Sequence, residues 1–109
     1  MTIMAQLDEW SSEVISVMAE IPEISHLKIV DLHQIPLGLL RRNATRLHAI
    51  CRYNKGVKKT GLVEPSDVRC IDIHPESLTP GWERYAKFLL YHEYLHALGY
   101  SNHGKEFRR

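Results

Sequence analysis

The stretch from Thr79 to Leu98 constrains the fold most, because it is apolar on nearly every side of a helical wheel. Its apolar residues are Trp82, Tyr85, Ala86, Phe88, Leu89, Leu90, Leu95 and Ala97. Thr79 and Pro80 are typical of an N-cap and a first helical residue, and Gly99 is typical of a residue that ends a helix. A helix of this kind is buried on most sides, so the rest of the chain must be arranged to cover it.

The second half of this stretch carries two histidines and a glutamate, in the pattern His92-Glu93-x-x-His96. Residues four apart lie one turn above each other on a helix, so both imidazoles project from one face. Two neutral imidazoles at that spacing suit zinc, which binds nitrogen at about 2.0–2.1 Å. Glu93 lies about 100° round the helix, where its carboxylate can reach a water molecule more easily than the metal. The competing interpretation makes both histidines hydrogen-bonded core residues.

A catalytic zinc ion usually has three protein ligands and one open position. After Gly99 turns the chain, His103 is near enough to return as the third ligand, and Glu106 is its competitor. The predicted set is His92, His96 and His103 around one zinc ion per chain. Glu93 is the predicted general base.

The rest of the chain predicts a small α+β domain. Apolar residues at helical spacing predict an N-terminal helix over residues 3–20 that packs into the core. Short β-branched or alternating runs predict strands at Leu27–His33, Thr45–Tyr53 and Val68–His74, with Gln34–Gly38 as a break after the first. We therefore expect an N-terminal helix, a three-stranded twisted sheet and a central helix that carries the motif.

Length and composition favour a single domain spanning residues 1–109. A hydrophobic content of 44% and a charged content of 25% are ordinary for a globular protein. No apolar run approaches the roughly 20 residues of a membrane span, and the N-terminus does not resemble a secretory signal. Cys51 and Cys70 form no C-x-x-C pair, so both are expected to be small apolar filler. These features predict a cytoplasmic protein that contacts no membrane.

Basic residues gather in one stretch. No acidic residue lies between Asp31 and Glu64, and seven of the fourteen basic residues fall there: Arg41, Arg42, Arg46, Arg52, Lys55, Lys58 and Lys59. Two interpretations are open. The Arg41–Lys59 stretch is either a solvated hairpin or a patch that faces the phosphates of DNA.

The motif pair His92-Glu93-x-x-His96 and His103-Gly104-x-x-Phe107 resembles that of the SprT-like zinc metalloproteases, a group of zincins. The N-terminal helix and three strands resemble this family more loosely, and the archaeal minigluzincins are similar in layout. The resemblance implies that the three histidines hold zinc and that the glutamate activates water. Spartan-type members digest proteins crosslinked to DNA. The seven-residue step from His96 to His103 is shorter than in many members.

The expected activity is hydrolysis of peptide bonds in a protein or peptide substrate. Zinc would lower the pKa of its bound water, and Glu93 would take the proton and pass it to the leaving amine. The resemblance implies that substrate adds as a strand to the sheet edge nearest the metal, expected at Val68–His74. Tyr100 and Arg69 are candidates to stabilise the oxyanion. The alternative function is a nucleic-acid-binding module with a non-catalytic zinc site.

Overall fold

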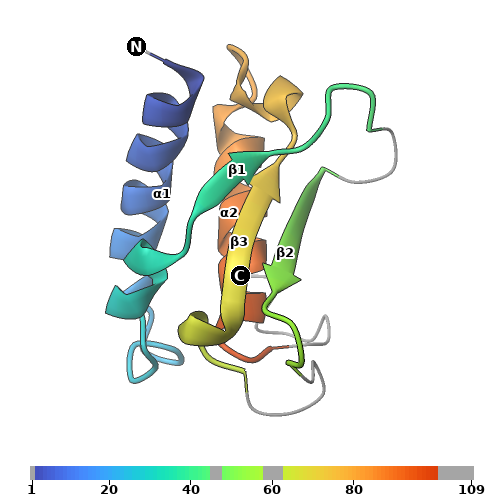
Figure 1. The fold of residues 1–109 in the computed structure, drawn as a ribbon. Helices are drawn as coiled ribbons and strands as arrows, with labels where there is room; N and C mark the ends of the chain where they lie inside the picture. The colour runs from blue at the N-terminus through green and yellow to red at the C-terminus, as the bar shows by residue number, and fades with distance from the viewer. Residues whose placement is uncertain (1, 45–47, 58–62, 101–109) are drawn as a thin grey trace.

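The computed structural model describes residues 2–44, 48–57 and 63–100. Two α-helices and three strands are found there: α1 (Ile3–Met18), β1 (Leu37–Leu39), β2 (Ala49–Tyr53), β3 (Val68–Ile73) and α2 (Glu83–Ala97) (Figure 1). Three short 3₁₀ helices connect them: η1 (Val30–Gln34), η2 (Pro65–Asp67) and η3 (Pro75–Leu78). The expectation of a small α+β domain with two helices and a three-stranded sheet is confirmed.

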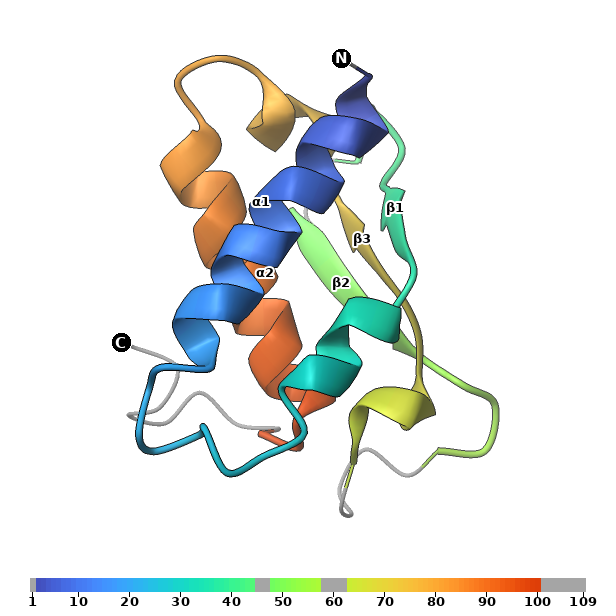
Figure 2. The same ribbon diagram turned by 90° about the vertical axis from the view of Figure 1, so that its left-hand side faces the viewer.

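The sheet has the strand order β1-β3-β2, with β1 parallel and β2 antiparallel to β3. Both α-helices lie on one face of this sheet (Figure 2). The expectation that Val68–His74 forms a sheet edge is wrong, because β3 is hydrogen-bonded on both sides. The two edges among the described residues are β1 and β2.

The predicted first strand, Leu27–His33, is also wrong. Its second half belongs to η1. The strand lies instead at Leu37–Leu39 and overlaps Gln34–Gly38, the residues expected to end the strand. Ile29, Leu32 and Ile35 are buried at intervals of three residues, which matches the three-residue turn of a 3₁₀ helix and not the two-residue period of a strand. The Ile29-Val30 pair has a high intrinsic preference for strands, but the residues that pair with β3 are Leu37–Leu39.

Gly38 is the reason that the sequence does not predict the observed first strand, Leu37–Leu39. It pairs with Asp72 in the parallel register, and a Cβ atom on Gly38 would collide with the Asp72 carboxylate. Arg52 holds that carboxylate through a 2.8 Å contact between Nε and Oδ2. A glycine that looks like a turn signal in the sequence therefore marks a close approach inside a strand.

The other element predictions hold with adjusted ends. The N-terminal helix begins after Thr2, whose hydroxyl accepts a 3.1 Å hydrogen bond from the Ala5 amide. The second strand is observed at Ala49–Tyr53, and residues 45–47 lie outside the described part. The central helix begins at Glu83, not at Thr79. Thr79 instead ends η3, donating its hydroxyl to the Glu76 carbonyl at 2.6 Å, and Gly81, with φ of +91°, then turns the chain.

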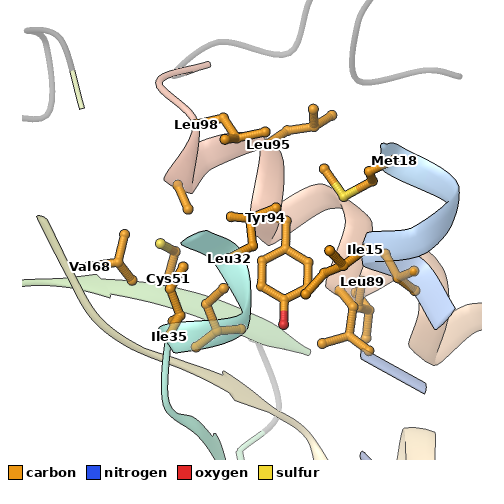
Figure 3. Close-up of a cluster of buried hydrophobic side chains, with 14 of the residues drawn as sticks. Ile15, Met18, Leu32, Ile35, Cys51, Val68, Leu89, Tyr94, Leu95 and Leu98 are labelled. Atoms are coloured by element: carbon orange, nitrogen blue, oxygen red, sulfur yellow. The ribbon is translucent and has the colours of Figure 1, made fainter. Parts of the chain in front are cut away.

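The core lies between the helices and the sheet, with α2 at its centre. Leu90 and Leu95 of α2, Leu7 of α1 and Ile71 of β3 are all fully buried. The Tyr94 ring sits among Ile15, Met18 and Leu32 in Figure 3. The described helices include none with the length and apolar character needed to cross a bilayer.

Candidate metal centre

The structure brings the two histidines of the motif together on α2. The rings of His92 and His96 have centroids 5.0 Å apart and planes inclined by 75°. Two imidazoles bound to one tetrahedral zinc ion would have centroids about 5 Å apart, given zinc–nitrogen bonds of about 2.0–2.1 Å. The separation of the pair therefore fits a shared metal ion.

A backbone carbonyl sets the protonation of His96. Its Nδ1 lies 2.8 Å from the carbonyl oxygen of Tyr100. A carbonyl can only accept a hydrogen bond, so Nδ1 carries the proton and Nε2 of the neutral ring keeps its lone pair. Histidines that bind metals commonly donate their other ring N–H to a carbonyl or carboxylate in this way. His96 is thus oriented as an Nε2 ligand.

The end of α2 places this carbonyl. Gly99 has φ of +110°, and its amide donates to the His96 carbonyl at 3.1 Å. The Tyr100 amide donates to the Leu95 carbonyl at 3.0 Å, which completes a Schellman cap. The expectation that Gly99 ends the helix is confirmed. The turn at Gly99 folds Tyr100 back beside the last helical turn, within reach of His96.

Glu93 is the buried carboxylate of the site, with 7% of its surface exposed. Burial disfavours its charged form and raises its pKa to about 7, and a hydrogen bond from the backbone of Cys51 opposes that shift. A carboxylate that titrates near neutral pH can both take up and release a proton during a reaction. Its position and pKa suit a general base.

Strand β2 runs beside α2, and no other strand of the described residues pairs with its outer edge. The His74 amide donates to the His48 carbonyl at 2.7 Å, just before β2 begins, so His48 faces β3. By the alternation of an antiparallel ladder, Ala49 and Cys51 direct their backbone groups to the other side. The bond from Cys51 to Glu93 is made on that side. The open edge of β2 therefore lies next to the motif.

The predicted third ligand is not tested by the structure. His103 and its competitor Glu106 lie outside the described residues. Within residues 2–44, 48–57 and 63–100, no three His, Cys, Asp or Glu side chains gather as a metal-binding group. The ligand set therefore remains a prediction, of which the structure describes His92 and His96.

The histidines outside the motif have other roles or surroundings. His74 is buried, with Nε2 donating to the Ala44 carbonyl at 3.1 Å and Nδ1 accepting from the Glu76 amide at 3.1 Å. His48 is hydrogen-bonded through Nδ1 to the Tyr85 hydroxyl. His26 and His33 are exposed.

The described basic residues of the Arg41–Lys59 stretch differ in their exposure and in their partners. Arg41, Arg42 and Lys55 are exposed, whereas Arg52 is engaged with Asp72. Arg46, Lys58 and Lys59 lie outside the described residues. Both interpretations of the stretch stay open.

Three aromatic residues near the motif are not among the predicted site residues: Tyr53, Tyr85 and Phe88. Tyr53, at the end of β2, is near enough to Glu93 for that charge to help raise its pKa, although burial contributes most. Tyr85 and Phe88 precede His92 by seven and four residues, on the same side of the helix. Their spacing is visible in the sequence, where it predicts core packing.

The predicted oxyanion candidates remain untested. Tyr100 is half-buried against the core, and Arg69 is exposed, where the pairing of β2 with β3 shifts register.

Comparison of the chain with known protein families, with curated proteins and with solved structures found no match.

Proposed function

We propose that this chain is a zinc-dependent metallopeptidase in which His92, His96 and His103 hold the metal. The observation that carries the proposal is the hydrogen bond from His96 Nδ1 to the Tyr100 carbonyl, 2.8 Å long. It leaves Nε2 of His96 as an acceptor beside His92 and the buried Glu93. Zinc, when bound, would acidify a water molecule and polarise a substrate carbonyl.

Glu93 does the proton transfer in this proposal. Its buried carboxylate, next to His92 in the chain, would accept a proton from water and return it to the leaving amine. The backbone of Cys51 fixes the carboxylate through its hydrogen bond, so the base is held in place before substrate arrives. Burying a carboxylate lowers the stability of the fold, and a non-catalytic binding site has no use for it. The burial of Glu93 therefore favours an enzyme over a non-catalytic binding module.

The substrate is expected to lie along β2. Among the described strands this edge is open and adjoins Glu93, so it replaces β3 as the expected docking strand. An added strand bonds mainly through its backbone, which suits a peptidase of broad specificity. The further suggestion that the substrates are DNA-associated proteins rests on the family resemblance and the Arg41–Lys59 stretch.

The decisive experiment compares Glu93→Gln with wild type for zinc content and for cleavage of an unfolded protein such as casein. We expect one zinc per chain in both proteins and a loss of cleavage of about 10²- to 10⁴-fold in the variant. Glu9→Gln, an exposed carboxylate on α1, is the matched control and should cleave normally. Unchanged cleavage by Glu93→Gln would remove Glu93 as the base.

The third ligand needs its own pair of variants. His103→Ala should lower zinc affinity strongly, and Glu106→Ala should leave it unchanged. The opposite result would make Glu106 the ligand. If the wild-type protein bound no zinc at all, the proposal would fail.

A further inference from the structure

A row of aromatic rings runs along one face of α2 to the histidine pair. Neighbouring centroids are 5.7 Å apart for Trp82 and Tyr85, 6.4 Å for Tyr85 and Phe88, and 6.0 Å for Phe88 and His92. Trp82 and Phe88 are 50% and 47% exposed, so the row is reachable from solvent. The rings connect the candidate metal centre with the start of the helix.

A pocket of about 300 Å³ opens at the start of this row. We name it the ring pocket, because the rings of His48, Trp82 and Tyr85 form its walls. Trp82 and Tyr85 meet edge to face, as do His48 and Tyr85. Its volume is sufficient for one large side chain.

Most polar groups that line the ring pocket already have a hydrogen-bond partner within the protein. Both ring nitrogens of His74 are already hydrogen-bonded, and the Ser77 hydroxyl donates to the His74 carbonyl at 2.7 Å. The Tyr85 hydroxyl is engaged by His48. Arg42 and Glu76 are exposed and carry opposite charges, which offset each other. The pocket therefore suits a neutral aromatic side chain, which gains by stacking and apolar burial.

The distance from the ring pocket to the histidines matches a short extended peptide. Tyr85 precedes His92 by seven residues, or about 10 Å of helix. An extended chain covers that distance in about three residues. Strand β2 spans the same interval, since His48 contacts Tyr85 at one end and Cys51 contacts Glu93 at the other.

We propose that the ring pocket is a specificity subsite for an aromatic residue of the substrate, about three residues from the cleaved bond. The inference rests on the proposed peptidase function. A peptide along the outer edge of β2, with its scissile bond at the histidine pair, would place that side chain in the ring pocket, against Trp82 and Tyr85.

The kinetic test uses peptides that differ at one position, with Phe in place of Ala moved along both sides of the cleaved bond. We expect kcat/KM to rise by about 10- to 200-fold when Phe stands two to four residues away, on one side only. Trp82→Ala should abolish that preference, measured as the ratio of kcat/KM for the Phe peptide to kcat/KM for the Ala peptide, and Trp82→Phe should restore much of it. Val30→Ala, a change at an exposed apolar residue far from the pocket, should keep the preference.

A binding test separates this inference from the proposed function. Glu93→Gln is titrated with the Phe and Ala peptides while the indole N–H signal of Trp82 is followed by NMR. We expect the Phe peptide to shift that signal and to bind about tenfold more tightly or better, even if the wild type cleaves nothing. The inference is overturned if both peptides act alike, if Asp or Lys at that position binds better than Phe, or if single-stranded DNA alone shifts the signal.

Discussion

One buried pair of hydroxyls joins the two helices next to the candidate site. The Ser11 and Tyr94 oxygens are 2.5 Å apart, and both residues are buried. Tyr94→Phe would leave the Ser11 hydroxyl without this partner, so we expect the free energy of unfolding to fall by about 1–2 kcal/mol at pH 8. Urea denaturation measures the change. Ser12→Ala, which removes an exposed hydroxyl from α1, is the comparison, and an equal loss there would contradict the assignment.

The same tyrosine predicts a loss of stability in alkali. Burial raises the pKa of Tyr94 to about 12, from 10.0. The unfolded chain therefore ionises first, and stability is intact below pH 10 and lost as the pH rises toward 12. The slope is about 1.4 kcal/mol per pH unit. Tyr94→Phe should lose less stability than wild type between pH 10 and 11.5, and parallel decline of the two proteins would refute this.

At the scale of elements, the cap of α2 is expected to control the metal site. Gly99→Ala would force a side chain onto φ of +110° and bring its Cβ to 3.1 Å from the Val63 carbonyl oxygen. The strained cap should cost about 1–3 kcal/mol. If Tyr100 shifts with it, His96 loses its carbonyl, and zinc affinity should fall by about 10- to 100-fold.

Gly56→Ala is the matched control for this prediction. Gly56 also has positive φ, of +91°, but a Cβ there meets nothing within 4 Å. It should lose stability through backbone strain and keep its zinc affinity. The Tyr100 carbonyl would have no positioning role if Gly99→Ala bound zinc as tightly as Gly56→Ala.

The elements predicted correctly are those whose sequence pattern and tertiary role agree. The core stripe of α1, the β-branched run of β3 and the glycine after α2 each carry a local signal that packing does not oppose. The first strand could not be found, because Gly38 is explained only by Asp72, a residue 34 positions later. The same holds for the sheet edge, since strand order depends on that long-range parallel pairing.

In the candidate site too, features with a local sequence signal were predicted, and features that depend on the fold were not. Helical spacing was enough to predict that His92 and His96 share a face. The Tyr100 carbonyl and the backbone of Cys51 could not be predicted, because both are main-chain groups whose position depends on the fold and not on residue type. Their partners His96 and Glu93 were identified, but the contacts that orient them were not.

At the scale of the whole molecule, the core is built from apolar side chains of both helices and of the sheet. Leu7, Ile71 and Leu90 come from α1, β3 and α2, and each is fully buried by the others and by their neighbours. We therefore expect the chain to stay folded when zinc is removed, unlike small zinc fingers. Far-UV circular dichroism of protein treated with a chelator should be close to that of the untreated protein.

Zinc should nevertheless stabilise this fold by mass action. Zinc at a thousand times its dissociation constant adds about 4 kcal/mol, which for a domain of this size raises Tm by roughly 10–20 °C. Glu93→Gln should show the full increase because its carboxylate is not a ligand, whereas His92→Ala should show little. A chain that unfolds on chelation would make the metal structural. A Tm that does not respond to zinc would leave the histidine pair without the role proposed for it.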